Sequence, residues 1–208
     1  MKNIRKIIQT YDAKAHGVQK GYAVLLPLIK INGDYHILYE VRSEHVSQAG
    51  DTSFPGGRIE TGESPKEAAV RETMEELNIK TENIDVIGEI DYIISYNRII
   101  YCYVGEIIGI DYRDIFPNIE VERLFTVPLD HLLENGPTVY NIHFKQTDKS
   151  KFPYHLVNRG MKYPFSQIQQ AVPFYELKDE TLWGFTANLT DRFIQIIKED
   201  KEADSDED

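Results

Sequence analysis

Three glutamates in the middle of the chain are spaced so that their carboxylates can act together. Glu72, Glu75 and Glu76 fall on one face of an α-helix, in which each residue advances by about 100°. Like charges at this spacing repel one another and destabilise a helix unless a cation neutralises them. Mg²⁺ and Mn²⁺ prefer oxygen ligands and leave positions open for water and substrate phosphates. The triplet therefore indicates a divalent-metal site or, taken alone, an ordinary exposed Glu-rich face of a surface helix.

The residues around these glutamates predict the helix that carries them. Ser64 suits the N-cap, Pro65 suits the first helical position, and Glu67 completes a capping box with Ser64. Asn78 tolerates the left-handed conformation in which many helices end. We therefore expect a helix that begins at Pro65 and ends near Asn78. The core-facing side, opposite the carboxylates, is expected to consist of Val70, Thr73, Met74 and Leu77.

A fixed spacing connects this helix with the loop before it. The pattern runs through Gly57, five residues, Glu63, seven residues, Arg71-Glu72, then Glu75-Glu76 and Ile79. This order resembles the Nudix box, G-x5-E-x7-R-E-U-x-E-E-x-G-U, in which U is a bulky aliphatic residue. Two positions depart from the motif: Thr73 replaces an aliphatic residue, and Asn78 replaces the last glycine. Neither departure changes a carboxylate, so the resemblance keeps its chemical content.

The resemblance to the Nudix box implies a role for each conserved position of that motif. It implies that Arg71 orients the glutamates and that Glu63 either supports them as a neighbour or acts as an additional metal ligand. Glu72 is the first candidate for the base that deprotonates the attacking water. The expected cofactor is Mg²⁺ or Mn²⁺. The metal ligands implied within the box are the carbonyl of Gly57 and the carboxylates of Glu72, Glu75 and Glu76.

The segments that flank the box resemble one branch of this family, the coenzyme A diphosphatases. The matching segments are residues 41–43, 48–57, 120–129 and 182–187. Gln48 stands where that branch usually has a histidine. The resemblance implies that Glu120 adds a further metal ligand, the alternative being a charged residue that begins a strand. The substrate-binding residues implied in the same way are Arg42, Ser43, Phe54 and Gly56, with a surface ion pair as the alternative for Arg42.

This likeness implies hydrolysis of the diphosphate in coenzyme A or its derivatives, giving 4′-phosphopantetheine and adenosine 3′,5′-bisphosphate. The nearest enzymatic alternative is a diphosphatase for another nucleoside diphosphate linked to X, such as ADP-ribose or NADH. An alternative of a different class is a Nudix-fold module that senses a nucleotide without cleaving it. The complete carboxylate set argues against such a module, which has no reason to keep four like charges close together.

The remaining elements must hold the acidic helix against a sheet. Predicted strands lie at residues 21–30, 35–42, 84–110 (two or three strands) and 121–127. Asn32-Gly33 predicts a hairpin between the first two of them. Further helical segments are predicted at residues 3–12, 130–134 and 189–199. We expect one α/β domain, and the resemblance implies the Nudix fold, an α/β/α sandwich with a mixed β-sheet.

The chain is expected to consist of three parts. Residues 1–20 form an N-terminal helical segment packed on the domain, because Ile4, Ile7, Ile8 and Tyr11 make one apolar stripe. Residues 21–197 form the Nudix hydrolase domain. Residues 198–208 form an acidic disordered tail, since seven acidic residues and two lysines carry five of the net negative charges there.

Composition limits the class of partner. The 23 Lys and Arg residues against 34 Asp and Glu residues give a net charge of −11, which argues against a nucleic-acid partner. No apolar run is long enough to span a membrane, so we expect no membrane partner. The single cysteine, Cys102, cannot form an intramolecular disulfide and favours a cytoplasmic location. The expected partner is a small-molecule nucleotide substrate, while the choice between monomer and homodimer stays open.

Overall fold

The computed structural model describes every residue except 1–2, 14–15, 18–19, 145–151, 166–167 and 206–208, with the backbone alone for 168 and 201–205. In this part of the chain the larger sheet has seven strands: β1 (Lys20–Ile31), β2 (Asp34–Arg42), β3 (Thr52–Ser53), β4 (Gly56–Arg58), β5 (Ile84–Ser95), β6 (Arg98–Ile107) and β7 (Val121–Pro128). A smaller sheet contains β8 (Thr138–Phe144), β9 (Ile168–Glu176) and β10 (Thr181–Trp183). The α-helices are α1 (Ile4–Gln9), α2 (Pro65–Leu77), α3 (Leu129–Glu134) and α4 (Gly184–Ser205). Short 3₁₀ turns are η1 (Thr81–Asn83), η2 (Tyr112–Asp114), η3 (Tyr154–Leu156) and η4 (Gly160–Lys162).

The larger sheet is mixed, which confirms the prediction. Its strand order is β3-β2-β1-β6-β5, with β4 also paired to β1 and β7 also paired to β2. Strands β1 and β6 run parallel, and the other recorded pairs in this sheet are antiparallel. The arrangement places β4 against the second half of α2, where Gly57 meets Glu72 and the Gly56 N–H donates to Glu76.

Strands β1 and β2 form the predicted hairpin and then separate. Asn32 and Gly33 have φ angles of 54° and 100°, the two positive values that a tight turn of this kind requires. Next to the turn, residues 28–31 of β1 pair with β2, while residues 22–24 pair with β4. Pro27, whose nitrogen has no hydrogen to donate, lies between the two pairings. This change of partner brings the Gly-rich strand β4 next to the middle of the sheet.

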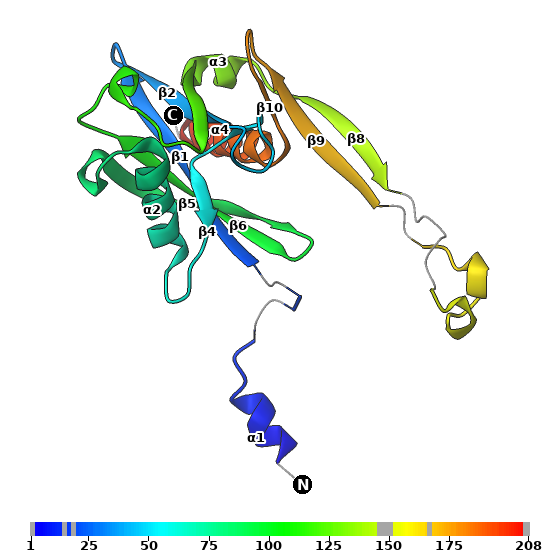
Figure 1. Cartoon of the computed structure of the whole chain (residues 1–208). Coiled ribbons are helices and arrows are strands. Elements are labelled where there is room, and N and C mark those ends of the chain that lie inside the picture. Colours follow the sequence, from blue (N-terminus) through cyan, green and yellow to red (C-terminus); the bar gives the residue numbers. More distant parts are fainter. Residues whose placement is uncertain (1–2, 14–15, 18–19, 145–151, 166–167, 206–208) are drawn as a thin grey trace.

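Helices cover both faces of the larger sheet, and this confirms the predicted sandwich (Figure 1). On one face, Leu77 of α2 packs with Leu38 of β2 in one apolar cluster. On the other face, Phe193 of α4 packs with Tyr39 of β2 in a second cluster. Because Leu38 and Tyr39 are neighbours in a strand, their side chains point to opposite faces. The site on α2 therefore lies on one side of the sheet, and α4 supports it from the other.

The smaller sheet includes a hairpin arm that the sequence did not predict as a unit. Strands β8 and β9 extend away from the sandwich, and η3 and η4 lie near the far end of the arm (Figure 1). The side chains of β8 are exposed, including the apolar Val139, Tyr140, Ile142 and Phe144. Pro153, Pro164 and Pro173 favour loops and short strands over residues 138–188. The long pairing of β8 with β9 joins residues far apart in the chain, so local sequence does not indicate it.

The N-terminal helix differs from the prediction that it packs on the domain. Helix α1 buries none of its residues, and Ile4 and Ile8 are 73% and 67% exposed. In Figure 1 it lies well away from the sandwich. Six residues make fewer than two helical turns, and the two sheet faces are already covered by α2 and α4. Residues 1–2, 14–15 and 18–19 of the expected 1–20 segment lie outside the described part.

The acidic tail also differs from the prediction of disorder. Helix α4 begins at Gly184, before the predicted start, and continues through the acidic tract to Ser205. The tract is rich in Glu, Lys and Ala, which favour helices, and Arg192 Nη1 donates to Glu199 Oε1 at 2.9 Å along the helix. Residues 206–208 lie outside the described part. Within the residues described, no helix has both the length and the apolar character needed to cross a membrane.

Candidate active site

Helix α2 carries most of the candidate site and begins and ends as predicted. Ser64 is the N-cap, its hydroxyl accepts from the Glu67 backbone N–H, and the Glu67 side chain completes the capping box. Asn78 ends the helix with φ 51° and ψ 42°, the left-handed conformation that glycine usually supplies. Thr73 is fully buried, and its Oγ1 donates to the carbonyl of Ala69 at 2.7 Å. Both departures from the motif are therefore accommodated by the backbone of α2.

The turn at Gly56 and Gly57 lies directly against α2. A Cβ at Gly56 would overlap the backbone of Ala23 and Val24 on the neighbouring strand, and a Cβ at Gly57 would overlap the Glu72 carboxylate. The N–H of Gly56 donates to Glu76 Oε2 at 2.7 Å. Gly56, which the resemblance assigns to the substrate, therefore holds a carboxylate through its N–H. Glycine is needed at both positions because two backbones and a carboxylate approach each other closely.

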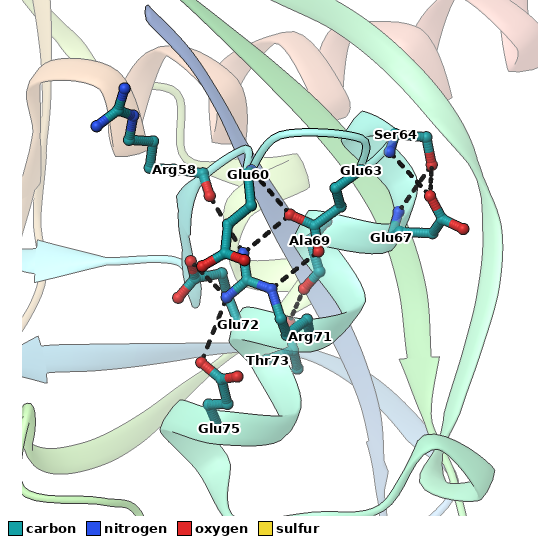
Figure 2. Close-up of polar contacts among 10 residues, drawn as sticks. All are labelled: Arg58, Glu60, Glu63, Ser64, Glu67, Ala69, Arg71, Glu72, Thr73 and Glu75. Carbon is teal, nitrogen blue, oxygen red and sulfur yellow. Dashed lines mark hydrogen bonds and ion pairs between the residues drawn. The ribbon is translucent and has the colours of Figure 1, made fainter.

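Arg71 connects the charged side chains around α2 (Figure 2). Its Nε and Nη2 donate to the two carboxylate oxygens of Glu63 at 2.8 and 3.0 Å. Its Nη1 lies 2.9 Å from Glu72 Oε1 and 3.3 Å from Glu75 Oε2, and Nη2 also donates to the Arg58 carbonyl at 3.1 Å. The hydrogen bonds from Arg71 lower the pKa of Glu63. The structure thus brings three glutamates of the predicted set together around the guanidinium of Arg71.

The buried side of α2 differs from the predicted one and includes a glutamate. The buried residues of α2 are Ala68, Ala69, Thr73, Glu76 and Leu77. Val70 and Met74, which were expected in the core, are only partly buried, while the Glu75 side chain is 58% exposed. The two alanines carry little side-chain volume, so this side of α2 can lie close to the sheet and take Glu76 into the interface. Burial raises the pKa of Glu76, and the nearby Glu40 charge raises it further.

The sequence did not predict Glu40 on β2, a carboxylate that the fold places near those of Glu72, Glu76 and Glu120. These four carboxylates are called the carboxylate cluster below. Glu40 is 1% exposed, and Ser53 Oγ donates to its Oε1 at 2.8 Å. Burial raises the pKa of Glu40, and the charges of Glu120 and Glu72 add to that effect. The available signal was strand alternation, since Glu40 follows the buried Leu38 by two residues and shares its face. A polar residue at this position is equally typical of a strand that leaves the core and ends in solvent. The alternation alone therefore did not identify Glu40 as part of the site.

Ser43 and Glu120 lie together at the edge of the cluster. The Ser43 N–H donates to the Glu120 carbonyl at 2.8 Å, and Ser43 Oγ donates to the Ile119 carbonyl at 2.6 Å. Glu120 is exposed, and its charge raises the pKa values of Glu40 and Glu72, which places its carboxylate in their neighbourhood. Ser43 is 7% exposed, and its two hydrogen bonds hold the segment that carries Glu120.

The two remaining predicted substrate contacts lie on opposite sides of the sheet. Arg42 is partly buried, its Nε donates to the Ser47 carbonyl at 2.9 Å, and its charge lowers the pKa values of Glu40 and Glu76. Phe54 is 4% exposed and stacks on Tyr39 in the cluster on the α4 side, with ring centroids 5.1 Å apart. Arg42 therefore lies near the carboxylates, whereas Phe54 belongs to the core on the other side of the sheet.

The carboxylate oxygens of this cluster are suitable ligands for a divalent metal ion, although they do not converge on a single position in this structure. In the part of the chain that the structure describes, no three His, Cys, Asp or Glu side chains are grouped closely enough to hold a metal. Protein donors hold two of the carboxylates, since Arg71 binds Glu72 and the Gly56 N–H binds Glu76. Carboxylate oxygens are nevertheless the ligands that Mg²⁺ and Mn²⁺ prefer. Glu40 Oε2 is buried and has no hydrogen-bond partner among the residues that the structure describes, as expected of an oxygen that a cation would satisfy.

Replacing Gly57 by alanine tests whether its contact with Glu72 is needed. The added Cβ would overlap the Glu72 carboxylate and displace it from the cluster. We expect Gly57→Ala to lower kcat by about 10²-fold, the loss that a displacement of about 1 Å can cause in a catalytic group. The measurement is steady-state diphosphate hydrolysis, with Gly136→Ala as the control, because a Cβ there meets no atom within 4 Å. Equal losses in both variants would contradict the assignment.

Comparison with known proteins connects this geometry with one family. A sequence model described as the NUDIX domain matches residues 22–140, more than half of the chain. Nudix hydrolase 3 of Caenorhabditis elegans is 34% identical over 121 residues, which cover 55% of this chain and 50% of that protein. The peroxisomal coenzyme A diphosphatase NUDT7 of Mus musculus is 29% identical over 131 residues, which cover 61% of this chain and 53% of that protein. The chain thus spans about half the length of these two relatives.

A solved structure supports the same fold. The crystal structure of a MutT/nudix family protein from Enterococcus faecalis superposes with a TM-score of 0.51, covering 95% of this chain and 70% of that one. The two sequences are 13% identical, so the likeness concerns the fold alone. It agrees with the mixed sheet between α2 and α4.

Proposed function

The chain belongs to the Nudix family, and we propose that it is a metal-dependent hydrolase of the diphosphate bond in coenzyme A or its derivatives. The observation that carries this proposal is the cluster around Arg71, in which Glu63, Glu72 and Glu75 share one guanidinium. Glu76 joins them from the buried side of α2. An assembly of like charges weakens a fold, and it is useful where a multivalent cation and a phosphate chain are bound together.

The proposed ligands divide between α2 and the loops around it. Nudix hydrolases generally use divalent metal ions. In this chain Mg²⁺ or Mn²⁺ would neutralise the diphosphate and acidify the attacking water. The residues proposed to hold the metal are Glu72, Glu76 and Glu120, with Glu75 and the Gly57 carbonyl as further ligands.

Glu72 is the proposed base for the attacking water. Partial burial raises the pKa of Glu72, which makes its carboxylate a better proton acceptor than an exposed glutamate. Arg71 Nη1, 2.9 Å from Glu72 Oε1, fixes the direction of the carboxylate, and Glu63 in turn fixes Arg71. The water oxygen bonds to one phosphorus as its proton passes to Glu72, and the bridging P–O bond breaks. The products are 4′-phosphopantetheine and adenosine 3′,5′-bisphosphate.

Arg42 is the proposed contact for a phosphate of the substrate. It approaches the carboxylates from β2 and brings positive charge to an otherwise acidic surface. A guanidinium matches the geometry of a phosphate by bidentate hydrogen bonding. The assignment to coenzyme A is supported by the residues around Arg42 that resemble the coenzyme A branch. The similarity to the mouse coenzyme A diphosphatase NUDT7 agrees with this assignment.

A groove at the edge strand β3 can receive the rest of the substrate. Its volume is about 740 Å³, and Asp51, Thr52, Phe174 and Trp183 are among its lining residues. Thr52 of β3 lines it, while the neighbouring Ser53 holds Glu40. Trp183 is 41% exposed and stacks on Phe174, so one aromatic face is available for a nucleotide base. Coenzyme A extends well beyond its diphosphate on both sides and needs room for these parts. The groove supports a substrate of this size.

A panel of substrates with separated products tests the proposed function. Purified protein is incubated with Mg²⁺ or Mn²⁺ and with coenzyme A, acyl-coenzyme A, ADP-ribose, NADH or diadenosine polyphosphates. We expect the highest kcat/KM for coenzyme A or its acyl derivatives, with the two products named above and no reaction in EDTA. Preference for ADP-ribose or NADH would replace the coenzyme A assignment by the broader nucleoside diphosphate class. Absence of turnover with every compound would refute the enzymatic function.

The partner and the location follow from the same proposal. A small-molecule nucleotide is the proposed partner, and the cytoplasm is the proposed location. The location rests on Cys102, which is free and fully buried. Burial raises the pKa of its thiol to about 12, so the thiol stays protonated and unreactive. Disulfides form in oxidising compartments, and a single buried thiol cannot form an intramolecular one, which is consistent with the reducing cytoplasm.

A further inference from the structure

Glu40 is held in the interior in a way that fixes one carboxylate oxygen and leaves the other unsatisfied. It lies on β2 directly opposite Ser53 of β3, and Ser53 Oγ donates to its Oε1 at 2.8 Å. Its Oε2 is buried and has no hydrogen-bond partner within the described part of the chain. Buried carboxylate oxygens are nearly always hydrogen-bonded or bound to a cation, so this atom calls for a specific partner.

The surroundings of Glu40 indicate a cation as that partner. Glu40 shares the α2 side of the sheet with Leu38, and its charge raises the pKa of Glu76. The charges of Glu72 and Glu120 act on it in turn, and Arg42 brings one opposite charge. Even with the Arg71 guanidinium on Glu72, these four carboxylates outnumber the guanidiniums beside them, so the group keeps a net negative charge that a divalent cation would offset.

We propose that Glu40 Oε2 is an additional ligand of the divalent-metal site, contributed by the sheet and facing the carboxylates of α2. The inference rests on the proposed metal-dependent function and adds to it a ligand from outside the acidic helix. Ser53 acts as the positioning residue, because its hydrogen bond to Oε1 directs the free Oε2. Glu40 is paired on both sides, with Ser53 of β3 and with Leu124 of β7, so the ligand would come from the interior of the sheet.

Direct metal binding by Glu40→Gln tests the inference. The replacement keeps the shape of the side chain and removes its charge. Calorimetric titration with Mn²⁺ alone is compared for the wild type, Glu40→Gln, Glu72→Gln and the control Glu134→Gln, whose side chain is exposed on α3. We expect Glu40→Gln to raise the Mn²⁺ dissociation constant at least tenfold, since loss of even an indirect partner of a metal ligand commonly has that effect. Glu134→Gln should bind as the wild type does.

Thermal unfolding in EDTA separates a ligand from a structural residue. We expect Glu40→Gln to unfold at the same temperature as the metal-free wild type or higher, because it removes a buried unpaired charge. A Mn²⁺ affinity within twofold of the wild type would overturn the inference while leaving the proposed function intact. Failure of the wild type to bind Mn²⁺ would overturn both.

A second variant covers the case in which Glu40→Gln does not fold. Glu40→Asp keeps the charge and withdraws the carboxylate by one methylene, so the fold retains its ionised group. We expect the same tenfold weakening of Mn²⁺ binding, because the shortened side chain no longer reaches the metal. Unchanged binding by Glu40→Asp would show that only the charge of this residue matters, and it would refute the role as a ligand.

Discussion

Glu72→Gln is expected to lower kcat for diphosphate hydrolysis by about 10²- to 10⁴-fold, the contribution of a general base. The amide keeps the volume of the side chain, so it still fits beside Gly57, but it accepts no proton and binds a cation poorly. Steady-state kinetics with saturating Mn²⁺ measures the loss. We expect KM to change much less than kcat, since the proposed phosphate contact, Arg42, is untouched.

Two comparisons make the Glu72 result specific. Glu134→Gln is the matched control, because it makes the same chemical change on exposed α3 and should leave kcat unaltered. The unfolding temperature of Glu72→Gln in EDTA should match that of the wild type, which excludes a general loss of structure. A Glu72→Gln protein with kcat within twofold of the wild type would rule out the proposed base and require another residue to accept the proton.

Mn²⁺ is expected to raise the unfolding temperature more at pH 8.5 than at pH 5.5. Burial raises the pKa values of Glu40, Glu72 and Glu76 above the ordinary value of 4.5. A carboxyl group with a raised pKa in the folded state stabilises the fold below pH 4.5 and loses that contribution as the pH rises through the folded value. The metal-free protein should therefore lose stability between pH 5.5 and 8.5, because Glu40, with a pKa of about 7, and Glu76, with a pKa of about 9, hold protons in the folded state that the unfolded chain has already lost. A bound cation should restore this stability.

The size of the effect follows from mass action. A ligand at about 100 times its dissociation constant stabilises the folded state by about 2.7 kcal/mol. For a chain of this length that corresponds to a rise of about 5–10 °C in the unfolding temperature. The measurement is a thermal melt at each pH with Mn²⁺ and with EDTA.

Glu63 and Glu67 do not contribute to this pH dependence, because their pKa values are shifted in the opposite direction. Hydrogen bonds from Arg71 and from Ser64 lower their pKa values, so their stabilisation is lost only as the pH falls below 4.5. They therefore contribute little between pH 5.5 and 8.5. A sodium chloride titration at matched ionic strength controls for general screening of charge. A rise with Mn²⁺ that is equal at both pH values, or larger at pH 5.5, would contradict the prediction.

Features that depend on neighbours in sequence could be predicted from the residues alone. The start of α2 at Pro65 and its end at Asn78 are local hydrogen-bonding choices, and the structure confirms both. The hairpin at Asn32-Gly33 is equally local, since two residues with positive φ are enough to turn the chain. The spacing from Gly57 to Ile79 predicted a family that the comparisons then showed.

The direction of a side chain within a packed element could not be predicted in the same way. Phe54 directly follows Ser53, the last residue of β3, yet Ser53 faces Glu40 while Phe54 stacks on Tyr39 on the other side of the sheet. Their order in the chain does not state which face each will take. The buried side of α2 likewise included Glu76 and excluded Val70, because close packing of α2 on the sheet, and not hydrophobicity, decided which residues were covered.

The sequence by itself determined the acidic helix, its limits and the likeness to a metal-dependent diphosphatase, because capping, turn chemistry and motif spacing act over a few residues. Only the tertiary structure decided that Glu40 belongs to the same cluster. Its burial arises from three elements distant in sequence, with Ser53 on β3, Glu76 on α2 and Glu120 before β7. The pKa and hydrogen bonding of a carboxylate change when it loses water and hydrogen-bond donors. Which of these it loses depends on the neighbours that the fold brings to it.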